Sequence, residues 1–86
     1  MPHATDFHQE LASIFRLAQD KRLTAIILKA GDLHRLVGGY PGADNRMPIC
    51  CNVMRQHMRH GDELVYEPPK GAGANLTIKY QFPRKA

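Results

Sequence analysis

The chain has 86 residues, 43% of them hydrophobic and 23% charged, which is the balance of one small folded domain rather than a disordered segment. Its longest aliphatic run, residues 25–28, is too short for a bilayer helix, and residues 1–10 lack the basic start and apolar stretch of a signal peptide. Two adjacent cysteines cannot build a disulfide framework, so we expect reduced thiols and a cytoplasmic location.

Charge is unevenly distributed along the chain. The formal net charge is +4; residues 1–23 balance to zero, whereas residues 44–60 carry +2 and residues 67–86 carry +3. A basic excess of this kind favours a polyanionic partner such as nucleic acid, although charge alone identifies no partner.

The first predicted element is an amphipathic helix over residues 6–20. Its apolar residues recur at helical spacing from Phe7 to Ala18. Thr5 or Asp6 suits the N-cap, and Gln9, three residues after Asp6, completes a capping-box pattern.

A short strand and a second helix follow. Residues 24–28 are β-branched and flanked by charges, which is typical of a brief strand. Residues 30–37 predict a helix of about two turns, ended by Gly38 in a left-handed C-cap conformation. The side chains expected to face inward from this helix are Leu33, Leu36 and Val37.

The third helix is predicted over residues 45–59, with Asn45 as N-cap and Pro48 inside the first turn. At 100° per residue, its apolar and polar side chains separate onto two faces. The apolar face holds Met47, Cys50, Cys51, Met54 and Met58, widened by Ile49 and Val53, and the remaining arc holds Pro48, Asn52, Arg55, Gln56 and Arg59.

The last predicted unit is a hairpin over residues 64–82, after a helix stop at Gly61. Strands are indicated at 64–66 and at 76–82, where apolar and polar residues alternate strictly. The loop PPKGAGAN between them, residues 68–75, is too long for a tight turn, and we expect it to be a flexible tip. Residues 84–86 are expected to form a frayed basic tail.

This order of helix, short strand, helix, turn, helix, strand, long loop and strand resembles the winged helix-turn-helix superfamily over roughly residues 6–83. The resemblance implies an α+β fold with three helices and a small antiparallel sheet. In that family the helix after the turn usually lies in the DNA major groove, and the hairpin forms a wing on the backbone or minor groove. Residues 46–59 would then be the recognition helix and residues 68–75 the wing, with a connector, residues 38–44, longer than the turn of the basic motif.

The polar arc of the third helix carries the side chains that read DNA bases. Arginine pairs with guanine, and asparagine or glutamine with adenine. A solvated helix face normally includes acids, whereas this arc has none. Lys70 lies between small residues that would let the loop backbone approach a phosphate. Our candidate DNA contacts are Arg46, Asn52, Arg55, Gln56, Arg59 and Lys70.

The sequence therefore predicts a non-enzymatic domain that binds double-stranded DNA, in transcriptional or mobile-element regulation, with no cofactor. One module of this size binds DNA modestly, so we expect a homodimer or a place within a larger complex.

Other chemistries fit the residues less well. Adjacent Cys50 and Cys51 lack the CxxC spacing of zinc ligands, and both fall on the apolar face, which argues against a metal site and against a nucleophile paired with histidine. The glycine segments 37–42 and 71–73 match no phosphate-loop pattern. His34 and Arg35 could contact backbone phosphate, but we expect both to be solvated surface residues.

A protein-interaction module is the main rival, because winged helices also serve in dimerisation and docking. The apolar arc of the third helix spans about 200°, which is broader than one core face requires. Exposure of residues 49 and 53, together with a salt bridge at Arg55, would favour docking over DNA binding.

Overall fold

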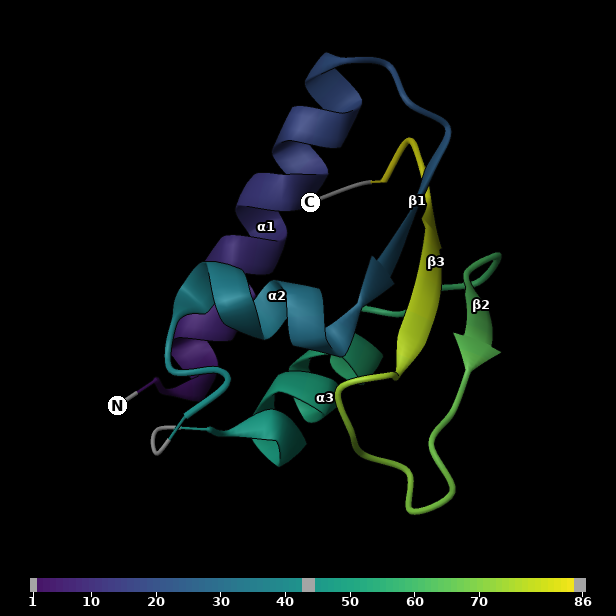
Figure 1. Ribbon diagram of the computed structural model, residues 1–86. Coiled ribbons are helices and arrows are strands. Elements are labelled where there is room, and N and C mark those ends of the chain that lie inside the picture. Colours follow the sequence, from purple (N-terminus) through teal and green to yellow (C-terminus); the bar gives the residue numbers. More distant parts are fainter. Residues whose placement is uncertain (1, 43–44, 85–86) are drawn as a thin grey trace.

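The computed structural model describes residues 2–42 and 45–84. The elements in chain order are α1 (Ala4–Asp20), β1 (Ala25–Lys29), α2 (Ala30–Val37), α3 (Met47–Gln56), β2 (Glu63–Tyr66) and β3 (Thr77–Gln81). The helices lie on one side of a three-stranded antiparallel sheet (Figure 1), so the predicted α+β class is confirmed. Among the described residues, no helix combines the length and apolarity that crossing a membrane requires.

The sheet is built around β3, which pairs antiparallel with β1 on one side and with β2 on the other. Ile78 lies opposite both Leu28 of β1 and Leu64 of β2, and the register then shifts before Tyr66. Over residues 76–82 the predicted alternation is confirmed except at Thr77, a polar position that is buried as well. The apolar side chains, all buried, are Leu76, Ile78, Tyr80 and Phe82.

The core lies between this sheet face and the helices. Hydrophobic spacing explains why α1 and α3 form there, because each turns one apolar stripe toward the sheet. From α1 the stripe is Phe7, Leu11, Phe15 and Ala18, and from α3 it is Met47, Cys50, Cys51, Val53 and Met54. The Tyr80 hydroxyl donates a 2.8 Å hydrogen bond to the Met54 carbonyl, which ties the sheet to α3.

Both long helices have bounds that differ from the prediction. The first begins two residues earlier, with His3 as N-cap, and Asp6 serves as the third helical residue, whose carboxylate accepts the His3 N–H at 2.7 Å. The third runs from Met47 to Gln56 instead of over residues 45–59. Its end comes early because the Asp62 carboxylate accepts the Arg59 N–H at 2.8 Å, which draws the following residues into a turn.

The second helix has the predicted bounds but a different inward face. Its buried stripe is Ala30, Leu33 and His34, with Val37 half-buried, whereas Leu36 is 61% exposed. These positions follow the i, i+3, i+4, i+7 spacing of one helix face, and Leu36 lies outside that spacing. The expectations that Leu36 faces inward and that His34 is solvated were therefore wrong. Arg35 is exposed and pairs with Asp32 at 3.3 Å.

The predicted basic tail is not frayed at Arg84. The side chain of this residue is 6% exposed and that of Asp62 is 1% exposed, and the two form an ion pair of 2.8 Å. The Arg84 backbone N–H donates to Gln19 at 3.0 Å, which attaches the end of the chain to α1. A buried carboxylate needs such a partner, and the sequence pattern did not indicate it. Residues 85 and 86 of the predicted tail lie outside the described residues.

Candidate nucleic-acid interface

The outer face of α3 presents polar side chains to solvent. Pro48, Asn52 and Gln56 are exposed, while the apolar face of the same helix is buried in the core. Asn52 and Gln56 are four residues apart, so they lie one above the other on the same side of the helix. The helix itself contains no acidic residue. These two amides are therefore placed to reach a surface that approaches α3 from outside.

Arg55 behaves differently from its neighbours on the helix. Its side chain is 33% exposed, and both terminal nitrogens donate to the same Glu67 carboxylate oxygen at 3.4 Å. Nη2 also donates to the Gly71 carbonyl at 2.7 Å. The guanidinium thus links α3 to the loop between β2 and β3. The sequence placed Arg55 on the polar arc among the DNA contacts, whereas the structure holds its side chain partly buried against this loop.

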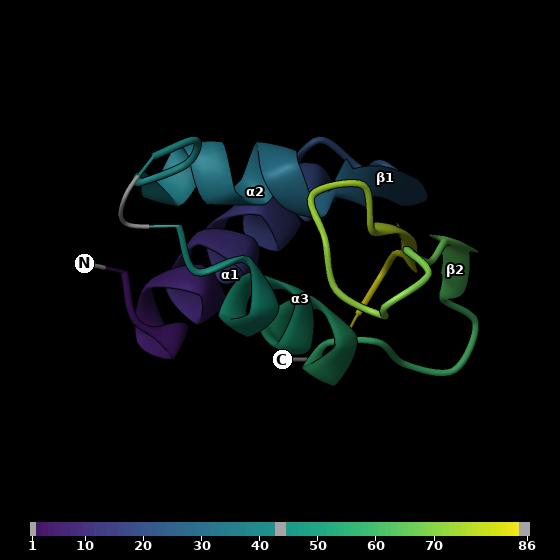
Figure 2. The same cartoon turned by 60° about the horizontal axis from the view of Figure 1, so that its bottom comes forward.

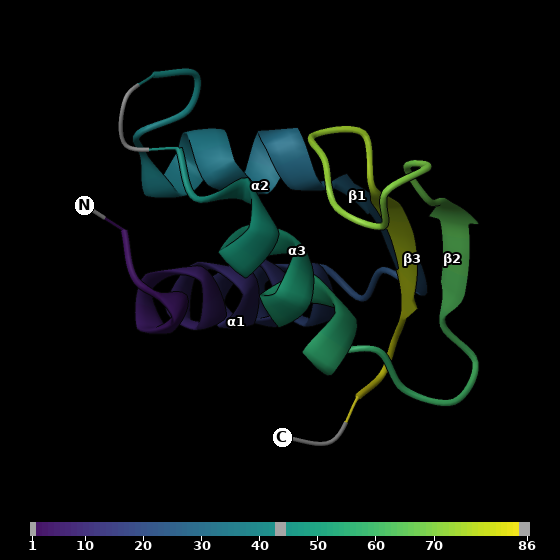
Figure 3. The same cartoon turned by 90° about the horizontal axis from the view of Figure 1, so that it is seen from below.

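The loop over residues 67–75, called the wing loop below, packs back onto the helices (Figures 2 and 3). The Cys51 thiol lies 3.4 Å from both the backbone nitrogen and the carbonyl oxygen of Gly73. The Gly31 N–H donates to the Ala74 carbonyl at 2.9 Å, and a Cβ at Gly31 would lie 3.2 Å from that oxygen. Pro68 is also buried, so the loop is docked against the helices. Our expectation of a flexible tip was therefore wrong.

Lys70 stays exposed on this docked loop. It directly precedes Gly71, whose carbonyl is held by Arg55 and whose N–H donates to the Pro68 carbonyl at 2.8 Å. The backbone that carries Lys70 is therefore fixed relative to α3.

The remaining two candidates lie at opposite ends of α3. Arg46 is the N-cap residue, and its N–H donates to Nε2 of His34 at 2.8 Å. Arg59 follows the helix end and is exposed. A ten-residue helix is about 15 Å long, so the structure places these arginines apart, on either side of the amide pair.

His34 was missed by sequence reasoning as a support of this surface. Its ring is fully buried, 4.9 Å from the Phe7 ring and 5.5 Å from the Tyr40 ring, measured between centroids. Because Nε2 accepts the Arg46 N–H, a neutral ring carries its proton on Nδ1, which has no hydrogen-bond partner among the described residues. The available signal was the spacing of residues 30, 33, 34 and 37, which puts His34 on the inward face.

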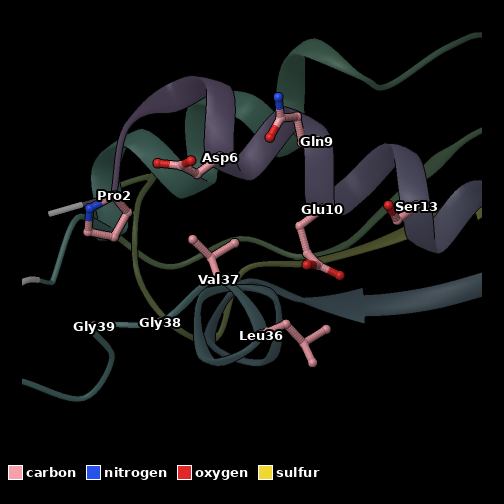
Figure 4. A pocket seen from close by; sticks show the side chains of 9 residues that line it. All are labelled: Pro2, Asp6, Gln9, Glu10, Ser13, Leu36, Val37, Gly38 and Gly39. Atoms are coloured by element: carbon pink, nitrogen blue, oxygen red, sulfur yellow. The ribbon is translucent and has the colours of Figure 1, made fainter.

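A groove of about 630 Å³ lies elsewhere, between α1 and the end of α2 (Figure 4). From α1 it is lined by Asp6, Gln9, Glu10 and Ser13, and from the other side by Leu36, Val37 and two glycines. Two carboxylates repel phosphate, so this face does not suit a nucleic acid. The surface around α3 is the better candidate.

The two cysteines have surroundings that suppress thiolate formation. Both thiols are buried, and Cys50 also donates to the Ala30 carbonyl at 3.5 Å. Burial, followed by the neighbouring Cys51, raises the pKa of Cys50 to about 12. Burial also raises the pKa of Cys51, against smaller lowering effects from Gly73 and Arg55. In the part of the chain that the structure describes, no three metal-binding side chains gather.

Comparisons with protein-family models, curated proteins and solved structures found no match to this chain. Function must therefore be argued from the geometry of the site.

Proposed function

We propose that the chain is a winged-helix domain that binds double-stranded DNA without catalysing a reaction. Its element order is the one that the resemblance predicts, with α3 as the recognition helix and the wing loop beside it. The observation that carries the proposal is the outer face of α3, where an exposed amide pair lies beside a docked loop that carries Lys70. Base-reading side chains next to a positioned cation are what a helix inserted in a groove needs.

The candidate residues divide into three roles. Asn52 and Gln56 read base edges, because they are exposed in the middle and at the end of the outer face. Arg46, Arg59 and Lys70 contact phosphates at the ends of α3 and on the wing. Arg55 is a positioning residue, because Glu67 and Gly71 already occupy its guanidinium.

Glu67 is bound to this surface by Arg55, and this pairing reduces the repulsion of phosphate by the Glu67 carboxylate. We include a homodimer or a larger complex in the proposal, because a single module of this size binds DNA weakly. Regulation of transcription or of a mobile element is the process that such a domain would serve.

The docking alternative depended on two conditions at α3. Arg55 does form a salt bridge, which favours docking. Val53, however, is 1% exposed and Ile49 is half-buried, so the apolar arc is used mainly by the core. The observations therefore support DNA binding more than a protein interface on this helix.

Titration of a fluorescent mixed-sequence duplex, followed by anisotropy at several salt concentrations, tests the proposal. Three phosphate contacts would give a slope of log K against log salt of about −3. Lys70→Ala should weaken binding to all sequences alike and change that slope by about one, whereas Lys21→Gln, a charge loss at the end of α1, should change neither. Absence of binding even at low salt would remove the proposal and favour a protein partner.

A further inference from the structure

A second cavity, of about 600 Å³, opens between the C-terminal half of α1 and the turn that follows α3. Its lining residues are Ala12, Phe15, Arg16, Gln19, Asp20, His57, Arg59 and Arg84. None of the amides assigned to base reading lines it, and it shares only Arg59 with the proposed DNA contacts.

Cationic groups predominate in this cavity. Three arginines and a histidine face one carboxylate, Asp20. Asp62 neutralises Arg84 from behind, with both carboxylate oxygens within 2.9 Å of Nη1. Arg16 and Arg59 are exposed and can reach a ligand that enters the cavity.

Arg84 forms a rigid wall of the cavity. Its guanidinium lies 4.8 Å from the centroid of the Phe15 ring, and Nη2 donates to the His57 carbonyl. A charge fixed in this way needs no reorganisation when an anion arrives. The cavity is therefore preformed on one side and adaptable at its mouth.

The pKa of His57 reflects its burial and the positive charges around the cavity. It is half-buried, and a 2.8 Å hydrogen bond joins its Nε2 to Nδ1 of His8. Burial lowers the pKa of His57 most, and the nearby positive charges of His8, Arg84 and Arg59 lower it further. His8, Arg84 and Arg59, from three parts of the chain, thus disfavour protonation of His57. A bound anion would offset their positive charge.

We propose that this cavity binds a phosphate group, held by Arg16 and Arg59 at the mouth and by His57 inside. Guanidinium groups suit this ligand because their planar N–H donors match the oxygens of a phosphate. The phosphate could belong to a free small molecule or to a DNA strand that passes beside α3. The first source does not depend on the proposed DNA binding, and the second does.

The first experiment follows the imidazole signals of the histidines by NMR during pH titrations. Inorganic sulfate is the probe, because its charge stays constant over this pH range, and sodium chloride at equal ionic strength is the control. We expect sulfate, but not sodium chloride, to raise the pKa of His57. No change at His57 would overturn the proposal.

Arg16→Gln and Lys21→Gln form a matched pair, since both remove one exposed charge from the end of α1 and only Arg16 lines the cavity. Arg16→Gln should raise the sulfate concentration for a half-maximal effect by about tenfold, the loss expected for one charge-assisted hydrogen bond. Lys21→Gln should not. Equal behaviour of the two variants, with thermal unfolding unchanged in both, would also overturn the proposal.

DNA titrations with the same pair identify the source of the phosphate. If Arg16→Gln changes the salt slope by about one, the site holds a backbone phosphate of bound DNA. If sulfate binds and Arg16→Gln leaves DNA affinity unchanged, the site takes a free phosphorylated ligand. Sequence-dependent weakening of DNA binding in Gln56→Ala tests α3 alone, so failure of one proposal is distinguishable from failure of the other.

Discussion

His34 connects the hydrophobic core with the start of α3, so a single buried ring supports the surface that we propose for DNA. Replacement by alanine removes the ring from between Phe7 and Tyr40 and leaves the Arg46 N–H without its acceptor. We expect His34→Ala to lower the free energy of unfolding by about 2–4 kcal/mol, measured by urea denaturation.

His34→Gln provides the comparison, because a glutamine carbonyl can accept the same N–H. It should lose less stability than the alanine variant. Equal losses in the two would show that packing of the ring matters and that the hydrogen bond to Arg46 does not.

The cysteine pair offers a second test at the scale of single residues. Burial raises the pKa of both thiols, to about 12 for Cys50, so neither forms the reactive thiolate at neutral pH. We expect iodoacetamide at pH 8 to modify the native protein very slowly and the urea-unfolded protein quickly, as followed by mass spectrometry. Rapid native alkylation of Cys51 would mean that the wing loop does not stay on α3.

At the scale of elements, the docked wing loop changes the role of Arg55. We expect Arg55→Ala to weaken DNA binding for all sequences alike, because the variant releases the loop that presents Lys70. Amide hydrogen exchange over residues 67–75 should accelerate in the same variant. Gln56→Ala should instead weaken the free energy of DNA binding by about 1–3 kcal/mol, by an amount that depends on DNA sequence. It should leave amide hydrogen exchange in the wing loop unchanged.

Arg55→Lys separates charge from geometry in this linkage. Lysine keeps the charge but cannot donate in a fork to both Glu67 and Gly71. Amide hydrogen exchange of the wing loop should therefore be slower than in Arg55→Ala but faster than with arginine at this position. A change of sequence preference in Arg55→Ala, with loop exchange unaltered, would return Arg55 to the set of base readers.

At the scale of the whole molecule, the Asp62–Arg84 pair joins the end of the chain to the turn after α3 and, through Phe15 and Gln19, to α1. Arg84→Ala leaves a buried carboxylate without its cation. We expect a loss of about 3–5 kcal/mol in the free energy of unfolding, measured by chemical denaturation.

The double variant Asp62→Asn with Arg84→Met tests this cause. It removes both charges while keeping most of the side-chain volume. Its loss in the free energy of unfolding should therefore be smaller than the sum of the losses in Asp62→Asn alone and Arg84→Met alone. Full additivity would show that the two residues do not act as a pair.

The stability of the molecule should also depend on pH through His57. Its pKa lies below the ordinary value of 6.5, mainly because of burial, so the unfolded chain binds a proton more readily than the folded chain does. The stabilising contribution is then present above pH 6.5 and is lost as the pH falls through the folded-state value. Denaturation midpoints at pH 7.5 and at lower pH should show this decline, and His57→Gln should flatten it.

Much of the fold followed from the sequence because it depends on local periodicity. A period of 3.6 residues placed the buried stripes of α1 and α3, and a period of two placed the inward residues of β3. The same reasoning put Asn52 and Gln56 on the outer face of α3, since an apolar stripe on one side leaves the other side to solvent. Helix ends were less well predicted, because capping depends on which side chain reaches which backbone group.

Tertiary structure decided the contacts between residues far apart in the chain. Arg55 meets Gly71 across 16 positions, and Arg84 meets Asp62 across 22 positions. No periodic pattern records such pairs, because a charged residue looks alike in sequence whether it is solvated or held by a distant carboxylate. The sequence by itself therefore determined which helix face is polar, and only the folded chain decided which of its polar groups remain exposed to meet a partner.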